Sequence, residues 1–203
     1  MYVPRFNAVD ETAIREMVAA VARASFITTG EDSYPLATLL PIVWTGDRVI
    51  AHLAVANPHW RQVAPDTPCL LVVDGPDAYV SPSWYASKAE HGRVVPTWNY
   101  ETVHLRGRAT VHRDAAWLRE AVTELTDAHE SGRSDRWQVS DAPEAYIAGQ
   151  LRGIVGVEIA IEHVEAKSKM SQNRSAANID GVVDGLRSSG TPRDEAVARV
   201  MDH

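Results

Sequence analysis

The chain opens with a hydrophobic pattern of helical period. Ile14, Val18 and Val21 recur every three or four residues, which places them on one face of a helix. Asp10 precedes the segment and is a favourable N-cap residue. The pattern therefore predicts a helix over residues 11–24.

After residue 25 the hydrophobic positions follow the shorter period of β-strands. The apolar runs are separated by Gly30 and by Gly46-Asp47, which are typical turn residues. A further turn is predicted at residues 74–76, where the sequence is Asp-Gly-Pro. The predicted strands span residues 26–29, 36–44, 48–53, 69–73, 101–111 and 154–164, with residues 78–80 as a continuation of the fourth strand beyond the turn.

Capping residues and helical spacing predict four more helices. A short one follows Asn57-Pro58 and reaches about residue 64, and Asp114 caps a longer amphipathic one. The other two span residues 144–151 and 192–200, and residues 179–186 form a further apolar segment in the C-terminal region. Residues 81–99 look irregular, and a structureless stretch of that length is usually functional or part of an interface.

These elements favour an α+β fold in which five or six strands form a small antiparallel barrel with flanking helices. The interior of such a barrel is filled by side chains. A large planar ligand would therefore lie against its outer face, where a second subunit can cover it.

Composition and charge exclude several classes of protein. The 203 residues carry a formal net charge of −7, which argues against a stand-alone DNA-binding protein. The single cysteine, Cys69, lies in an apolar run and is expected to be buried rather than part of a disulfide. The chain lacks a membrane-length apolar run, and its first six residues lack the order of a secretory signal, so we expect a cytoplasmic protein with no membrane partner.

Four runs of sequence resemble the PaiB-like proteins, a family usually described as FMN-binding negative transcriptional regulators. They are residues 51–60 (AHLAVANPHW), 75–85 (GPDAYVSPSWY), 95–100 (VPTWNY) and 167–174 (KSKMSQNR). The resemblance covers about residues 1–187, and residues 188–203 then form a short helical tail. It implies a homodimeric split β-barrel related to the flavin-binding pyridoxamine-phosphate-oxidase fold.

The same family contains haem-dependent piperazate synthases, which cyclise N5-hydroxy-L-ornithine by forming a nitrogen–nitrogen bond. The resemblance therefore implies either FMN or haem b as the cofactor. Val55 stands where the family typically has Arg, and Ala166 and Ser168 replace a Gly and a Trp. These changes remove a phosphate contact and a stacking surface, which favours haem over FMN.

Histidines supply the candidate iron ligands, because a neutral imidazole is a common axial ligand of haem. His59 is our first prediction, since it lies at a rigid helix start. His52 and His104 on predicted strands are the competing ligands. The alternative for His59 is that it packs on Trp60 and hydrogen-bonds to the backbone.

Other side chains are candidates for holding the rest of the cofactor. The amides after Asn57 can receive an anionic group, and Arg61, Arg106 and Arg108 can add ion pairs. Aromatic residues of the irregular segment can cover a planar ring or form a dimer contact. The predicted cofactor-binding residues are His52, Asn57, His59, Trp60, Arg61, Trp84, Trp98, His104, Lys167, Lys169, Gln172, Asn173 and Arg174.

Two functions from different classes follow. The first is a haem-dependent piperazate synthase-like enzyme that closes the ring of an amino-acid substrate with loss of water, with Tyr85, Lys88 or His91 as the proton donor. The second is an FMN-binding PaiB-like regulator without turnover.

Overall fold

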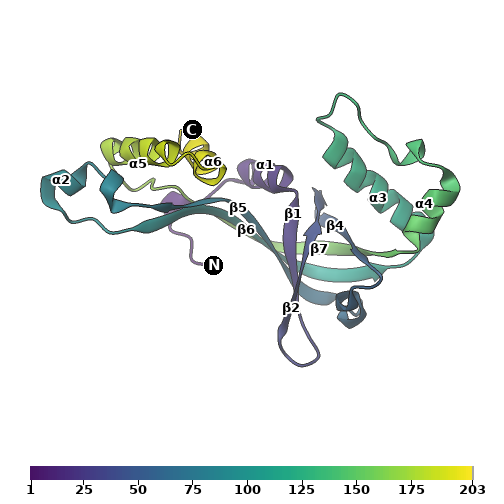
Figure 1. Cartoon of the computed structure of the whole chain (residues 1–203). Helices are drawn as coiled ribbons and strands as arrows, with labels where there is room; N and C mark the ends of the chain where they lie inside the picture. Colours follow the sequence, from purple (N-terminus) through teal and green to yellow (C-terminus); the bar gives the residue numbers. More distant parts are fainter. Residues whose placement is uncertain (203) are drawn as a thin grey trace. The chain divides into compact units, whose positions relative to one another are not determined.

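The computed structural model describes residues 1–202, which contain one seven-stranded antiparallel sheet and six α-helices (Figure 1). The strand order is β2-β1-β5-β6-β7-β4-β3. The strands are β1 (Arg23–Thr29), β2 (Pro35–Pro41), β3 (Val43–Thr45), β4 (Arg48–Ala54), β5 (Thr67–Val80), β6 (Thr97–His112) and β7 (Ile154–Lys169). The α-helices are α1 (Glu11–Val21), α2 (Ser87–His91), α3 (Ala115–Glu130), α4 (Glu144–Leu151), α5 (Ala176–Ser188) and α6 (Pro192–Met201). Short 3-10 helices are η1 (Arg5–Asn7), η2 (Pro58–Gln62), η3 (Pro82–Trp84) and η4 (Val139–Asp141). This is the expected split β-barrel.

The chain divides into two compact units. The barrel unit comprises residues 15–73 and 104–164, and the terminal unit comprises residues 1–14, 74–103 and 165 onward. Strands β5, β6 and β7 contribute residues to both units.

The barrel unit is built on alternating side chains. In β1, Phe26 is fully buried and pairs in register with Thr38 of β2, whereas in β4 the fully buried Leu53 pairs with Val155 of β7. The inward positions are apolar because alternate residues of a strand point to the same face. The lone thiol of Cys69 is buried, as predicted.

Helix α3 packs on this unit through two kinds of contact. Ala121 and Leu125 pack against Ile50 of β4. The indole of Trp117 lies on Gly156 of β7, where an added Cβ atom would stand 1.9 Å from the ring. Gly156 is therefore the place where the absence of a side chain lets the helix approach the sheet.

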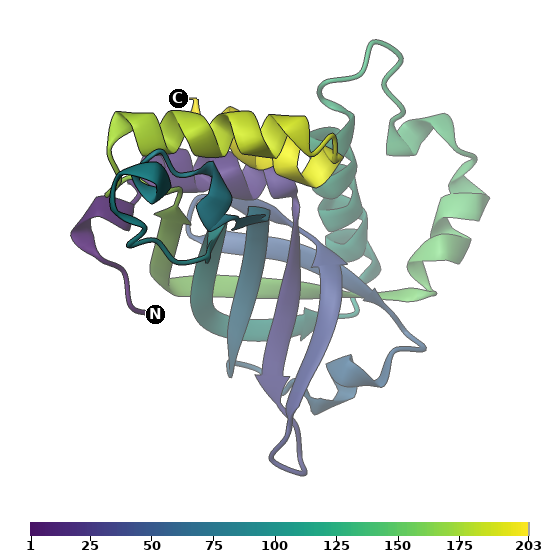
Figure 2. The same cartoon turned by 60° about the vertical axis from the view of Figure 1, so that its left-hand side comes forward.

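The terminal unit has its own apolar core. Val182 and Leu186 of α5 and Val197 of α6 are completely buried together with Val80 at the end of β5. Two views show α5 and α6 lying side by side along one face of the strands of this unit (Figures 1 and 2). Thr191 caps α6 by accepting a hydrogen bond from the amide of Asp194.

Several predicted boundaries are wrong, each for a local reason. The first helix ends at Val21 because Ala22 takes a left-handed conformation (φ 53°). The predicted strand over residues 36–44 is two strands that part at Ile42, whose amide donates to the carbonyl of Ala22. The predicted turn at residues 74–76 does not exist, since β5 runs straight through it.

Other elements are longer or more regular than predicted. The segment 81–99 contains η3, α2 and the start of β6 instead of being irregular throughout. Strand β7 continues to Lys169, five residues beyond the predicted end. Among residues 1–202 no helix has the length and apolar character needed to cross a membrane.

Candidate functional site

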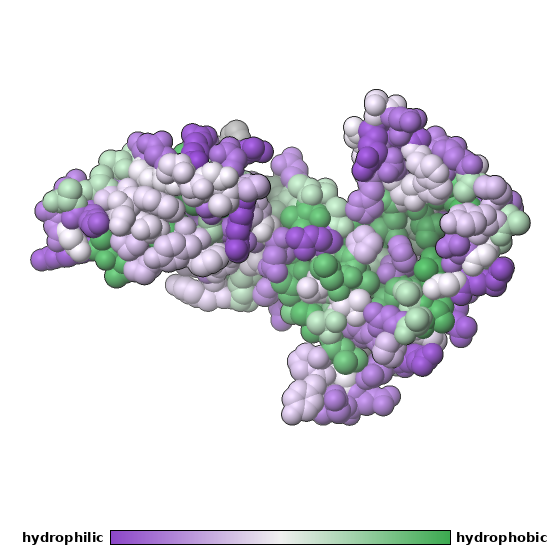
Figure 3. All heavy atoms as spheres, in the orientation of Figure 1, coloured by the Kyte–Doolittle hydropathy of each residue, from purple (hydrophilic) through white to green (hydrophobic). Residues whose placement is uncertain are grey.

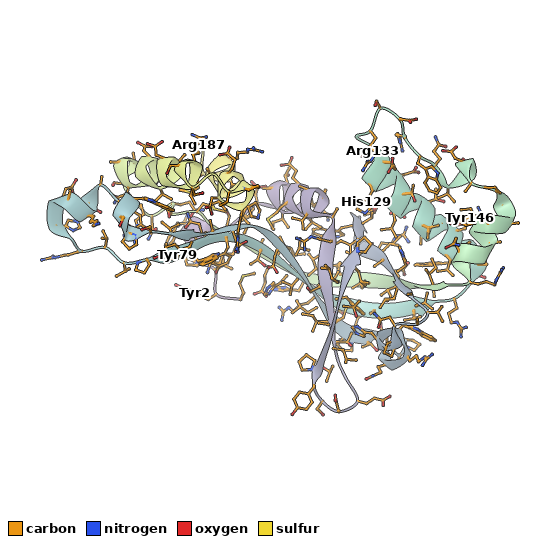
Figure 4. All side chains as sticks on the ribbon, in the orientation of Figure 1. Tyr2, Tyr79, His129, Arg133, Tyr146 and Arg187 are labelled. Carbon is orange, nitrogen blue, oxygen red and sulfur yellow. The ribbon has the colours of Figure 1, made fainter. Side chains whose placement is uncertain are left out.

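A hollow of about 280 Å³ in the terminal unit collects most of the predicted C-terminal motif. It lies between the N-terminal segment and the ends of β6 and β7, and the stick view shows Tyr2 on that segment (Figure 4). We call it the cationic hollow. Its lining residues are Tyr2, Pro4, Phe6, Asn7, Thr97, Asn99, Lys167, Lys169, Ser171, Asn173 and Arg174.

Three cationic side chains line the cationic hollow without an acidic residue among the lining residues. The ammonium of Lys169 donates to the carbonyl oxygen of Trp98 at 2.6 Å and to the hydroxyl of Thr97. Burial lowers the pKa of Lys169, and the charges of Lys167 and Arg174 lower it further. An anion bound here would offset both the desolvation of the Lys169 ammonium and the repulsion among the three cationic side chains.

The turn after β7 presents these donors. Ser171 has a left-handed backbone (φ 65°), and its hydroxyl donates to Asn99 Oδ1 at 3.1 Å. The amide of Gln172 is engaged within the turn, accepting from the Met170 amide and donating to the Ser168 carbonyl. Gln172 therefore stabilises the turn. Its role in cofactor binding stays a prediction, and these two hydrogen bonds do not favour it.

Asn7 is a lining residue that sequence reasoning missed. Its side chain is 3% exposed, and its Oδ1 atom has no hydrogen-bond partner among the described residues. A buried acceptor without a partner costs free energy unless a ligand or water satisfies it. Nothing in the sequence pattern around Asn7 singles it out, because its position comes from the three-residue helix η1.

The structure places His59 away from any open surface. The imidazole is 4% exposed, stacks on Phe26 with 4.8 Å between ring centroids, and uses both ring nitrogens. Nδ1 lies 2.8 Å from the hydroxyl of Thr38, and Nε2 lies 2.9 Å from that of Thr28. An iron bond would require one of these hydrogen bonds to break, so this geometry favours a structural histidine. Burial also lowers its pKa, which keeps it neutral.

The predicted anion site at the start of η2 is occupied by the chain itself. Asn57 Oδ1 accepts the backbone amide of His59 at 3.0 Å, which satisfies the donor that an anion would use. The indole of Trp60 donates to the Val55 carbonyl, and the guanidinium groups of Arg61 and Arg113 each lie 5.5 Å from its ring centroid.

His52 is more accessible than His59. It lines a second hollow of about 280 Å³, in the barrel unit, together with His129 of α3, which is labelled in Figure 4. Burial lowers the pKa of His52, and its Nδ1 atom has no partner within residues 1–202. The third histidine, His104 on β6, is half-buried and lines neither hollow.

The predicted aromatic wall is dispersed over the terminal unit. Trp84 packs on α5, where a Cβ atom added to Gly185 would stand 2.3 Å from the indole. Trp98 is 42% exposed and donates from Nε1 to Asp77 at 2.8 Å. Neither indole lines the cationic hollow.

The three predicted proton donors do not converge. Tyr85 is buried in the core of the terminal unit, and its hydroxyl has no partner in the described part of the chain. Lys88 donates to the Ser83 hydroxyl at 3.3 Å, and His91 Nδ1 accepts the Arg93 amide at 3.0 Å. None of the three lines the cationic hollow, so their catalytic role stays a prediction.

Comparisons with known proteins agree on one family. The family model described as "Putative FMN-binding domain" matches residues 1–163. The chain is 31% identical over 209 residues to protease synthase and sporulation protein PAI 2 of Bacillus subtilis, covering 100% of this chain and 97% of that protein. It is 36% identical over 148 residues to an uncharacterized protein of Aspergillus fumigatus, covering 65% of this chain and 57% of that protein.

Solved structures share the fold at low identity. The FAD and haem binding protein from Mycobacterium smegmatis superposes with a TM-score of 0.64 at 16% identity, over 87% of this chain and 79% of that one. The flavocytochrome Anf3 from Azotobacter vinelandii gives a TM-score of 0.61 at 19% identity, over 82% and 72%. The family-model match and the full-length relative establish that the chain belongs to the PaiB-like family of FMN-binding-domain proteins.

Proposed function

We propose that the protein binds FMN and holds its phosphate in the cationic hollow. The observation that carries the proposal is the grouping of Lys167, Lys169 and Arg174 without an acidic partner among the lining residues. A phosphate dianion accepts several charge-assisted hydrogen bonds, and arginine and lysine are the side chains that supply them. The family description supports the same cofactor.

The unpartnered acceptor of Asn7 supports FMN over haem at this hollow. FMN carries ribityl hydroxyls beside its phosphate, and these can donate to Asn7 Oδ1. The carboxylates of haem only accept hydrogen bonds when ionised. No histidine is among the lining residues of the hollow, so an iron centred there would lack an imidazole from them.

When bound, FMN supplies one- and two-electron redox chemistry. The chain's own residues would bind and orient it: the cations fix the phosphate, and the strand and turn backbone hold those cations in place. A regulatory role, in which cofactor occupancy changes the behaviour of the protein, fits the family's usual description. Direct DNA binding is not part of the proposal, because the chain is acidic.

We propose that the protein works as a homodimer through the outer face of β1 and β2. Leu39 of β2 is 59% exposed, and hydrophobic surface gathers around β1 and β4 of the barrel unit (Figure 3). Exposed apolar surface marks interaction sites, and a second copy of the same chain is the commonest partner for such a face. A chain that stays monomeric in light scattering at micromolar concentration, with cofactor bound, would contradict this.

A haem-dependent piperazate synthase-like cyclase is the second candidate. Its specific support is His52, which borders a hollow, whose pKa is lowered by burial, and whose Nδ1 atom has no hydrogen-bond partner within the described residues. Haem would supply an iron centre that polarises the N–O bond of N5-hydroxy-L-ornithine. Ring closure breaks that bond, joins the α-amine nitrogen to N5, and releases the oxygen as water, so no external oxidant is needed.

The absorption spectrum of the purified protein separates the candidates. We expect paired flavin bands; a Soret band that disappears in His52→Ala would favour the cyclase. In titrations with FMN, the double variant Lys169→Ala/Arg174→Ala should bind at least about 100-fold more weakly, since each charged hydrogen bond contributes about 1.5–3 kcal/mol. Arg199→Ala, which removes an exposed arginine of α6, is the matched control. Unchanged FMN affinity in the double variant would refute the proposed phosphate site.

A further inference from the structure

The barrel unit contains a second cationic recess that the proposed function does not use. It lies between α3 and α4 and has a volume of about 560 Å³, within the range of small-molecule sites. We call it the α3–α4 groove. It is lined by Arg113, Leu118, Arg119, Glu144, Leu151 and Arg152, together with three alanines.

The floor of the groove is apolar and fixed. Leu118 and Leu151 belong to the core that joins α3 to α4, with exposed fractions of 3% and 6%. Ala115, Ala116 and Ala148 supply small side chains that leave the space open. Such a floor accommodates an apolar body without a change in the core.

The rim of the groove carries excess positive charge. Three arginines face one glutamate, and that glutamate, Glu144, already pairs with Arg119. Arg152 donates one hydrogen bond to the Ala148 carbonyl at 3.0 Å, so four of its five N–H donors remain for a ligand. Arg113 has no ion pair in the described part of the chain, and its guanidinium carbon lies 5.5 Å from the centroid of the Trp60 ring.

We propose that the α3–α4 groove binds a small amphipathic carboxylate, with the carboxylate on Arg113 and Arg152 and the apolar body on the alanine and leucine floor. The charge of the rim selects an anion, and arginine presents the planar fork that matches a carboxylate. The alanines select an unbranched or flat apolar body over a bulky polar one. The site is separate from the cationic hollow, so the proposal stands whichever cofactor that hollow takes.

The test is calorimetric titration of the full chain with octanoate, using 1-octanol as the uncharged match. We expect octanoate to bind at least tenfold more tightly than octanol. In Arg113→Gln/Arg152→Gln, the Kd for octanoate should rise at least tenfold, and Ala148→Met, which fills the floor, should weaken octanoate and octanol alike. Arg133→Gln removes an arginine that lies outside the groove with a side chain 68% exposed, and should leave the Kd within twofold.

The arginine positions are exposed, so the double variant should keep the far-UV circular dichroism of the parent. Equal affinity for octanoate and octanol, or an unchanged Kd in the arginine double variant, would overturn the proposal. The proposal would also be overturned if the parent did not bind octanoate at concentrations up to about 10 mM, since binding weaker than that corresponds to a binding free energy of less than about 3 kcal/mol.

Discussion

Replacing Gly156 with alanine should detach the start of helix α3 from the sheet. The added Cβ atom would stand 1.9 Å from Cζ3 of Trp117 and within 2.8 Å of two further ring atoms. Carbon atoms in contact need about 3.5 Å, so the indole must move by about 1.6 Å or more. Its ring also stacks on His112, with 4.1 Å between centroids and 9° between planes, so it cannot shift without losing that contact.

The cost can be bracketed from this geometry. Overpacking a close-packed site costs about 1–3 kcal/mol. Losing half of the burial of an indole adds about 2.5 kcal/mol, if the side chain buries about 200 Å² at about 25 cal/mol per Å². The reduced flexibility of the unfolded chain offsets about 0.5–1 kcal/mol. We expect Gly156→Ala to lose about 2.5–5 kcal/mol of unfolding free energy and about 5–20 °C of melting temperature.

Urea unfolding followed by far-UV circular dichroism measures this loss. Gly149→Ala is the matched control, because Gly149 lies inside α4 and an added Cβ would only reach ordinary contact with Arg152, at 3.8 Å. That variant should be as stable as the parent or gain up to about 1 kcal/mol. If Gly156→Ala unfolds at the same urea concentration as the parent, the contact between Trp117 and β7 does not anchor α3.

Three further outcomes are expected. His59→Ala should lower the unfolding free energy of the cofactor-free protein by about 2–4 kcal/mol, because a buried ring and two hydrogen bonds are removed. A decrease below about 0.5 kcal/mol would contradict a structural role and support His59 as an iron ligand. Cys69 should resist thiol reagents at pH 8 in the folded state and react after unfolding, because burial raises its pKa to about 12; rapid reaction in the native protein would contradict this. Burial raises the pKa of Asp77, but the hydrogen bonds from Arg193 and Trp98 outweigh burial, so the pKa of the folded carboxyl is lowered. Asp77 should therefore contribute stability above the pKa of the unfolded carboxyl, about 3.9, and this stability should be lost as the pH falls through the pKa of the folded carboxyl. Asp77→Asn should therefore flatten the acid limb of the melting-temperature profile, and an unchanged limb would exclude that role.

Local patterns predicted the caps and strands of this fold well. Asp114 caps α3 as the sequence indicates, because capping depends on a few adjacent residues. The turn predicted at residues 74–76 is wrong because β5 continues through it beside β6, and the carboxylate of Asp74 accepts a hydrogen bond from the side-chain hydroxyl of Thr102 of β6 at 3.1 Å. A partner 28 residues away can override a local turn preference.

The candidate site was only half accessible to sequence reasoning. The charged motif at residues 167–174 predicted a cationic site. Its residues Lys167, Lys169, Asn173 and Arg174 do line one hollow. Asn7 and Thr97 join them through tertiary folding alone, which leaves no local signal. The prediction for His59 rested on its place after Asn57-Pro58, and that place says nothing of the two threonine hydroxyls that bind the ring.

The buried lone thiol has a practical consequence for spectroscopy. Because Cys69 is the only cysteine of the chain and is shielded, new cysteines on the surface can be labelled selectively without removing it. Exposed positions such as Tyr146 in the barrel unit and Arg187 in the terminal unit, both labelled in Figure 4, can each carry a nitroxide. Pulsed electron resonance between the two labels would then report how the distance between the units responds to FMN and to octanoate.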